Sequence, residues 1–379
     1  MNVGKRLTLV AAAAVTCVGL VGAGTASAES PKKAPPAQPG VTVLATGLNG
    51  PRQLSATSKN VYVAESDAGQ VSRVAKRTGA VRVSVTGATL AQGVVKTDGR
   101  LYIASGAPMP EEGARMVNGS AEILVAKRYG KPRTFADLLA YELKHNPDNQ
   151  IQFGPNGNLL DALSNPDYVV RSKFKGQFLL VADGGRNDVL AVSKKGKVST
   201  FFVPPSVTTG PCATKPQNSD AGPSCDAVPT GLAFGPDGNL YISAATALAP
   251  GEGRVYVVNK NGKLVKTWTG FDGPTGIAVA PDGSVYLSEV LEGLGGEPGA
   301  RALAKAAAAP AFDPSAVGQI VKVAPNGTRT YAQVTMPTGL LWSGGKLYAS
   351  AWSIIGGPPF NVPDAGQVVT VAPSAFVAK

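Results

Sequence analysis

Short apolar runs separated by tight polar turns recur along the whole chain. The clearest copy is Gly270 to Glu289, in which two apolar runs, 277–280 and 285–287, flank a Pro281-Asp282-Gly283 turn. Proline presets φ, aspartate bonds its own backbone, and glycine accepts the left-handed conformation that a tight reversal needs. This stretch therefore predicts a β-hairpin.

Six copies of the second strand of this hairpin can be aligned. Tyr62 and Tyr102 are 40 residues apart, and Tyr241 and Tyr286 are 45 apart, which is the range of a four-stranded propeller blade. A third strand follows each copy, and a fourth strand follows five of them. The pattern predicts an all-β fold, a six-bladed β-propeller of four-stranded blades. The six copies are VYVAES (61–66), LYIASG (101–106), FLLVAD (178–183), LYISAA (240–245), VYLSEV (285–290) and LYASAW (347–352).

The last repeat is incomplete. After its third strand, 367–372, the chain continues only through PSAFVAK, which contains no fourth strand. The segment VTVLATG, Val41 to Gly47, precedes Pro51 in the same way that a fourth strand precedes Pro274. We therefore expect this N-terminal strand to pair with the last blade, which closes the ring and removes an exposed sheet edge.

The N-terminus has the features of a secretory leader. Lys5 and Arg6 precede an apolar, small-residue stretch that ends at Ala26-Ser27-Ala28, a small-residue cleavage pattern. A retained membrane anchor or a lipidated Cys17 is the alternative. We expect a signal peptide at 1–28, a flexible linker at 29–40, one propeller domain at 41–379, and a secreted, extracellular or wall-associated protein with no transmembrane segment after processing.

Removal of the leader leaves two cysteines. Cys212 and Cys225 flank the polar loop ATKPQNSDAGPS. In an oxidising compartment an even pair predicts a disulfide, whereas two free thiols would have to be buried by a loop too polar to do so.

Two segments carry a resemblance to a known family. ADLLAYELKHNPD (Ala136 to Asp148) and VADGGRNDVL (Val181 to Leu190), together with the repeated P-x-G and PDG turns, resemble the ScyD/ScyE family of secreted NHL-type propellers. The resemblance implies a six-bladed, TolB-like propeller and no settled activity. Related propellers include calcium-dependent lactonases and quinone-dependent sugar dehydrogenases. Asp167 stands where the resemblance implies an aromatic residue.

Loop lengths distinguish the two faces of the predicted ring. The turns that join strands a to b and c to d are short, whereas all six insertions fall between strands b and c or between d and the next a, which share one face. Because functional residues collect on long loops, we expect that face to be the functional one. By count the insertions contain fourteen acidic and six basic residues, and the opposite turns are rich in lysine and arginine. An anionic cell envelope is the expected partner of the basic face, and nucleic acid is not expected.

Catalytic combinations are scarce in the sequence. The single histidine, His145, ends a predicted short helical insertion over 136–145, where it is either a solvated cation near the helix C-terminus or a general base. A histidine-rich metal site is excluded, but an all-oxygen calcium site is not. The candidate ligands, or else ordinary loop-stabilising side chains, lie where strand a begins and strand b ends: Gln53, Glu65, Asp167, Asp183, Asn187 and Glu289.

Two functions follow. The first is a secreted binding or scaffold propeller that recognises an unknown small molecule or protein through its long b–c and d–a loops. The second is an enzyme on the same face, either a metal-assisted lactonase-like hydrolase or a quinone-dependent sugar oxidoreductase. The lack of acid–base residues favours the first.

Overall fold

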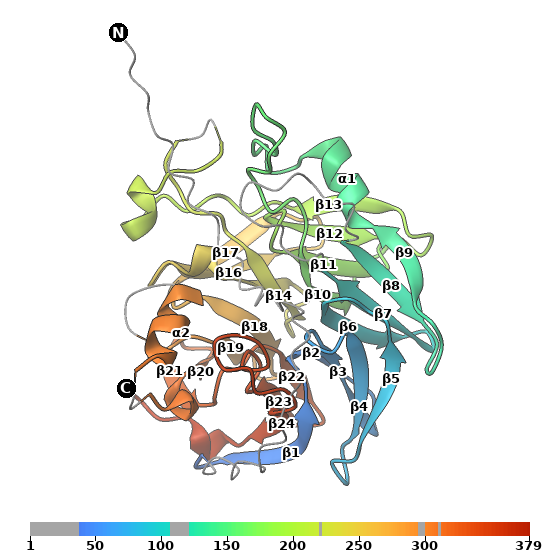
Figure 1. Ribbon diagram of the computed structural model, residues 1–379, viewed down its shortest axis with the longest axis vertical. Coiled ribbons are helices and arrows are strands. Elements are labelled where there is room, and N and C mark those ends of the chain that lie inside the picture. Colours follow the sequence, from blue (N-terminus) through green and yellow to red (C-terminus); the bar gives the residue numbers. More distant parts are fainter. Residues whose placement is uncertain (1–37, 107–120, 220–221, 295–299, 310–311) are drawn as a thin grey trace.

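The fold is a ring of six four-stranded antiparallel sheets, which a computed structural model describes over residues 38–106, 121–219, 222–294, 300–309 and 312–379 (Figure 1). The six-bladed propeller prediction is therefore confirmed. The innermost strands converge on the ring centre, and each blade continues outward in chain order. Blade 1 consists of β2 (Pro51–Ala56), β3 (Asn60–Glu65), β4 (Gln70–Ala75) and β5 (Val81–Thr86). Blade 2 consists of β6 (Ala91–Thr97), β7 (Arg100–Ser105), β8 (Glu122–Ala126) and β9 (Arg133–Asp137).

The next three blades follow the same order. Blade 3 consists of β10 (Pro166–Arg171), β11 (Leu179–Asp183), β12 (Asp188–Val192) and β13 (Val198–Phe202). Blade 4 consists of β14 (Pro229–Phe234), β15 (Leu240–Ala244), β16 (Gly253–Val258) and β17 (Leu264–Phe271). Blade 5 consists of β18 (Pro274–Val279), β19 (Val285–Glu289), β20 (Gln319–Val323) and β21 (Arg329–Gln333).

Blade 6 combines both ends of the chain. Its strands β22 (Leu340–Ser343), β23 (Lys346–Ala351) and β24 (Gly366–Val371) are completed by β1 (Val41–Leu48). β1 pairs antiparallel with β24, from Val41 opposite Val371 to Leu48 opposite Gly366. The predicted closure is confirmed, and it leaves β24 paired on both sides.

Aromatic packing and glycine turns join neighbouring blades. Between blades 2 and 3, Tyr102 meets both Phe135 and Phe178 edge to face, with ring centroids 5.0 Å apart in each pair. Gly196, in the turn between β12 and β13, has φ of 80°, and a Cβ there would collide with the carbonyl oxygen of Phe135. Gly262 lies in the same way against blade 3, so only glycine fits where this turn approaches the preceding blade.

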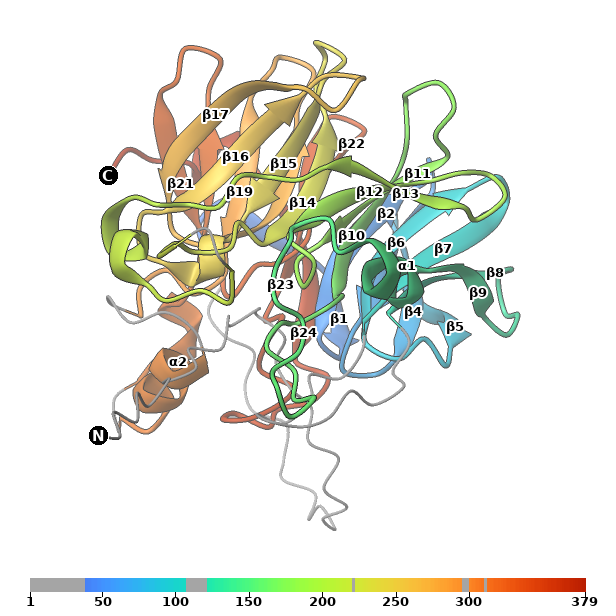
Figure 2. The ribbon, with the colours of Figure 1, turned by 90° about the horizontal axis from the view of Figure 1, so that it is seen from above.

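The helices lie in the insertions. α1 (Leu138–His145) begins two residues later than the sequence indicated, because 136–137 complete β9 and Asp137 caps the helix by accepting from the Ala140 amide at 2.9 Å. A second helix, α2 (Ala300–Ala307), was not predicted. It lies on the side of the ring opposite the short hairpin turns (Figure 2). The 3₁₀ helices are η1 (Gly210–Thr214), η2 (Thr246–Leu248), η3 (Pro314–Ala316) and η4 (Pro373–Ala375).

The predicted disulfide is confirmed. Cys212 and Cys225 are bonded, with Cα atoms 5.1 Å apart, and both are buried. Val207 and Cys225 also exchange backbone hydrogen bonds, which fixes the base of the loop. The predicted leader at 1–28 and most of the linker lie outside the described residues, as do the parts of the insertions at 107–120, 220–221 and 295–299. Within the described residues no helix is long and apolar enough to span a membrane.

Candidate functional site

One recess at the ring centre receives a side chain from every blade. These side chains occupy equivalent places, one residue after the proline or alanine that leads into the innermost strand. They surround a cavity of about 50 Å³. The six positions, from blade 1 to blade 6, are Arg52, Gln92, Asp167, Thr230, Thr275 and Thr338.

The threonines of blades 4 to 6 hold the ring together. The Thr230 hydroxyl donates to the Pro274 carbonyl of the next blade at 2.7 Å. Thr275 donates to Pro337 at 3.3 Å, and Thr338 donates to Pro51 at 3.0 Å. Each Pro-Thr-Gly repeat thus ties its blade to the next, so this half of the ring is structural.

Gln53 and Tyr168 close the bottom of the recess. Each stands one residue further along its strand, where the other four blades have glycine. Gln53 Oε1 accepts from the amides of Val94 (3.1 Å) and Val169 (2.9 Å), and its Nε2 donates to the Val169 carbonyl at 2.7 Å. The Tyr168 hydroxyl crosses the channel to the Leu340 carbonyl, 2.9 Å away. Gln53, a predicted ligand, is therefore engaged in linking blades 1, 2 and 3.

Arg52 and Gln92 keep polar atoms without protein partners. Arg52 is only 6% exposed. Its Nη1 donates to the Ser353 carbonyl at 2.7 Å, and its Nη2 lies 3.7 Å from Asp67 Oδ1. Its Nε has no hydrogen-bond partner among the described residues. Gln92, 4% exposed, forms no side-chain hydrogen bond with a described residue. A buried guanidinium with an unpartnered Nε, beside a cavity that the Gln92 side chain also lines, is the chemistry of a binding site.

Asp167 completes the polar half of the recess. It is half-buried, and its Oδ1 accepts from Asn165 Nδ2 at 3.2 Å. Burial raises the pKa of its carboxyl well above the usual range, the nearby Asp183 raises it further, and Arg52 opposes the shift. Asp167 was one of the predicted ligands and lines the recess, whereas the sequence gave no reason to place Arg52 and Gln92 beside it.

Asp183 lies at the end of β11, where it holds the insertion between blades 2 and 3. The side chain is fully buried. It accepts from the Ser164 hydroxyl and the Asn165 amide, both at 2.6 Å, and from the Arg186 amide at 3.3 Å. Burial raises the pKa of this carboxyl. Its oxygens are committed to the loop, so it is poorly placed to bind a metal.

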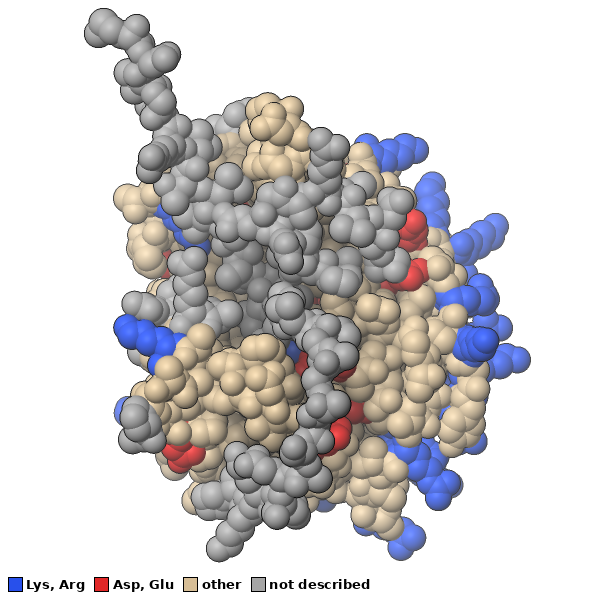
Figure 3. All heavy atoms as spheres, in the orientation of Figure 1, with Lys and Arg blue, Asp and Glu red and all other residues tan. Residues whose placement is uncertain are grey.

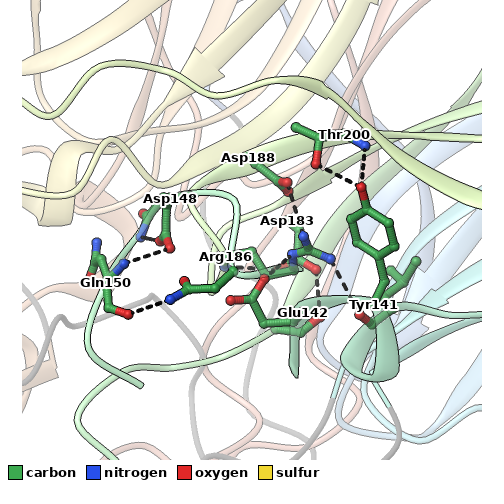
Figure 4. A network of polar contacts seen from close by, with 12 residues as sticks. Tyr141, Glu142, Asp148, Gln150, Asp183, Arg186, Asp188 and Thr200 are labelled. Carbon is green, nitrogen blue, oxygen red and sulfur yellow. Dashed lines mark hydrogen bonds and ion pairs between the residues drawn. The ribbon is translucent and has the colours of Figure 1, made fainter. Parts of the chain in front are cut away.

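Arg186 is the centre of a buried ion-pair network (Figure 4). Its Nε lies 2.9 Å from Glu142 Oε2 on α1, its Nη2 lies 3.2 Å from Asp188 Oδ2, and its guanidinium covers the Tyr141 ring at 5.0 Å. Burial raises the pKa of Glu142 to about 7, although Arg186 opposes that shift.

Asn187 joins two insertions. With φ of 55°, it donates from Nδ2 to Asp148 Oδ2 at 3.1 Å and accepts from the Val228 amide at 3.3 Å. Asp148 belongs to the insertion before blade 3, and Val228 to the one before blade 4. Asn187 is thus a bridge between loops, and it does not line the recess.

Glu65 and Glu289 act alike in blades 1 and 5. Each ends the second strand, and its carboxylate accepts from a loop amide and from a glutamine at the start of the third strand. Glu65 accepts from the Asn49 amide at 2.8 Å and from Gln70 at 3.1 Å. Glu289 accepts from the Asp272 amide at 2.8 Å and from Gln319 at 2.5 Å.

Glu289 also belongs to a small acidic group. One carboxylate oxygen from each of Asp272, Glu289 and Glu292 lies within 4.8 Å of the others. Burial is the largest cause that raises the pKa of Glu289 to about 7. The six predicted ligands are therefore distributed among separate places: Gln53 and Asp167 meet in the recess, and the others hold loops. His145 is exposed and stacks on Tyr141, with centroids 4.4 Å apart.

The architecture defines a six-bladed β-propeller with a closed channel and a polar recess at its mouth. No protein-family model matches the chain, and no curated protein matches it. Among solved structures, the aldose sugar dehydrogenase of Streptomyces coelicolor in its PQQ-bound form is 14% identical, with 89% of this chain and 99% of that chain covered and a TM-score of 0.52.

Two other solved propellers are similar to the same extent. The calcium-binding protein regucalcin from Agrobacterium tumefaciens str. C58 is 13% identical, with coverage of 87% and 92% and a TM-score of 0.52. A catalytically inactive virginiamycin B lyase from Staphylococcus aureus with quinupristin is 13% identical, with coverage of 88% and 98% and a TM-score of 0.50. At these identities the likeness establishes the fold alone.

Proposed function

We propose that this chain is a secreted β-propeller that binds a ligand or partner through its loop-rich face, with Arg52, Gln92 and Asp167 as the residues that determine specificity. The proposal rests on a difference between the two halves of the central ring. Half of the central ring consists of threonines engaged in bonds between blades, whereas these three positions keep unsatisfied or accessible polar groups beside a cavity.

The size of the recess indicates what enters it. A water molecule needs roughly 10–15 Å³ of such space, so about 50 Å³ accommodates one small polar group of a ligand and not a sugar ring. Arg52 supplies donors, Gln92 supplies both a donor and an acceptor, and the raised pKa of Asp167 lets it donate when protonated. A carboxylate, amide or hydroxyl at the end of a ligand satisfies this set.

We also propose membership of the ScyD/ScyE family, with a leader at 1–28, a linker at 29–40 and secretion. The two segments that carry the resemblance contact each other, since Arg186 of ADGGRND pairs with Glu142 of ADLLAYE. A contact between the two most specific segments supports the idea that they belong to one structural unit. The disulfide is compatible with an oxidising compartment.

Catalysis is the less supported alternative. A metal-assisted hydrolase or a quinone-dependent sugar oxidoreductase needs ligands with free oxygens or a roomy pocket. Glu65, Asp183 and Glu289 instead bind loop amides and neighbouring side chains. Turnover of a lactone or sugar panel with added calcium, lost in Asp167→Asn, would favour the enzyme over the binding protein.

The binding proposal is tested by variants of the recess. A thermal-shift screen of small carboxylates, amides and polyols identifies a ligand, and calorimetry then compares Gln92→Leu and Asp167→Leu with the wild type. Loss of one hydrogen bond to a charged group, about 1.5–3 kcal/mol, predicts affinity about 10-fold weaker or more. His145→Ala, on the same face but outside the recess, is the control. Unchanged affinity in both recess variants would contradict the assignment.

A further inference from the structure

A second surface lies on the opposite face, at the hairpin turns of blades 2 and 3. The turns of blade 3 form a hollow of about 620 Å³ that is lined by five basic residues. Those of blade 2 form a hollow of about 280 Å³ that is lined by four. Neither hollow contains an acidic residue. The nine residues, named here the basic track, are Arg171, Lys173, Lys175, Lys194 and Lys195 in blade 3, and Arg100, Lys127, Lys131 and Arg133 in blade 2.

The two hollows are adjacent. Gly196, directly after Lys195, packs against the Phe135 carbonyl, and Phe135 lies two residues after Arg133 in β9. The close approach at Gly196 therefore brings the edge of one hollow to the edge of the other. Basic side chains gather along the side of the ring where blades 1 to 3 lie (Figure 3).

The charge of this surface is not paired with carboxylates of the described residues. No ion pair involves a residue of the basic track within the described part of the chain. Nearby, Lys96 is brought close to Arg128, and its pKa is lowered by burial and then by that neighbour. Like charges held together cost stability unless a partner or solvent relieves them.

The turns of blades 4 to 6 do not share this concentration of basic residues. In blades 1 to 3 the turns 57–60, 76–80, 97–100, 127–133, 172–177 and 193–197 contain thirteen basic residues and one acidic residue. In blades 4 to 6 the turns 235–239, 259–263, 280–284, 324–329 and 343–346 contain four basic and two acidic residues. The same turns of the same fold therefore differ in charge from one half of the ring to the other.

Some of the basic side chains are held in place. Arg171 donates from Nη1 to the Phe178 carbonyl at 2.7 Å and lies over the Phe178 ring at 4.6 Å, and Lys173 lies over Phe234 at 5.2 Å. Lys175, Lys194 and Lys195 are exposed, and their ammonium groups form no cation–π contact or ion pair with a described residue. Lysine ammonium groups are compact point charges that suit phosphate without demanding one geometry.

We propose that the basic track binds a linear polyanion whose repeating charge is a phosphate or phosphodiester group. The hollows are concave, so a flexible chain can lie along them and place successive charges inside, whereas a flat bilayer would touch only the tips. This surface is on the opposite face from the recess. It would attach the protein to an anionic polymer of the cell envelope while the loop-rich face remains open.

The test uses the full chain and labelled long-chain inorganic polyphosphate, with binding followed by fluorescence anisotropy between about 50 and 200 mM salt. Replacing Lys173, Lys175, Lys194 and Lys195 by glutamine should weaken binding about 100-fold and reduce the salt slope by about 3, since each phosphate contact contributes roughly 0.7 to that slope. The same four changes to arginine should retain binding. Lys260→Gln with Lys263→Gln, in the corresponding turn of blade 4, should change it less than about twofold.

Several results would overturn the proposal. They are unaltered binding in the glutamine variant, binding that does not respond to salt, and a carboxylate polymer such as polyglutamate binding as tightly as polyphosphate. Tighter binding to phosphatidylserine vesicles than to polyphosphate would assign the face to a membrane. Because none of the altered residues lines the recess, failure here leaves the ligand proposal untouched, and the reverse also holds.

Discussion

The charge on Glu289 should destabilise the folded protein at neutral and alkaline pH. The side chain is 2% exposed, and burial raises its pKa from an ordinary value of 4.5 to about 7, against the opposing hydrogen bonds from Gln319 and the Asp272 amide. Between these two pH values the folded state holds a proton that the unfolded state has lost. Stability should therefore fall as the pH rises through this window, by about 3 kcal/mol in all.

Glu289→Gln removes the charge and keeps the shape. The Oε1 atom of the new glutamine can still accept from the Asp272 backbone amide. Its Nε2 can donate to the side-chain oxygen of Gln319 once the Gln319 amide group rotates by half a turn. We expect the variant to be up to about 3 kcal/mol more stable than the wild type at pH 8, and to differ by less than about 1 kcal/mol at pH 5. Urea unfolding at both pH values measures this directly. The melting temperature at pH 8 should rise by about 5 °C.

Glu65→Gln is the matched control in blade 1. Glu65 has the same two kinds of partner, and burial raises its pKa as well, but among the described residues it belongs to no three-carboxylate group like that of Glu289. Its variant should be stabilised at pH 8 in the same direction and by less. Two results would contradict this prediction: a Glu289→Gln variant that is less stable than the wild type at pH 8, or a difference in the free energy of unfolding that is the same at both pH values. Either result would mean that the hydrogen bonds to the carboxylate outweigh its desolvation.

Two further predictions concern the ring closure and the disulfide. Deleting the chain through Thr46 removes most of β1 and exposes the edge of β24, so the melting temperature should fall by far more than when only 29–37 is trimmed; equal effects would contradict the closure. Replacing Cys212 and Cys225 by serine opens a loop of sequence separation 13 and should lower the free energy of unfolding by about 3 kcal/mol, measured by urea. A stability equal to that of the wild type would show that the backbone bridge at Val207 is sufficient.

The fold could be predicted because its signals are local and repeated. Each hairpin is specified by its own turn, as in Pro281-Asp282-Gly283, and each repeat predicts the same kind of hairpin. Even the closure, a contact between residues more than 300 apart, was visible as one strand missing at one end and one extra strand at the other. Helix α2 was not found, since its alanine-rich sequence lies in an insertion with no counterpart in the other blades.

The candidate site was predicted only in part. The sequence pointed to carboxylates near the channel: Asp167, and Glu65 and Glu289, which accept hydrogen bonds from loop amides. What distinguishes a binding residue from a structural one here is whether its polar atoms are already satisfied, and only packing reveals that. One feature of the sequence could have identified Arg52 and Gln92. They occupy the position that is threonine in three other blades.

That same comparison of equivalent positions separates the two halves of the ring. In blades 4 to 6 the central positions are uniform threonines and the turns are nearly neutral. In blades 1 to 3 the same positions become Arg52, Gln92 and Asp167, and the same turns become basic. Repeats that share one fold have no structural need to differ at equivalent sites, because the threonines show what closing the ring requires. The departures are therefore the best guide to function, and on both faces they fall in the N-terminal half of the propeller.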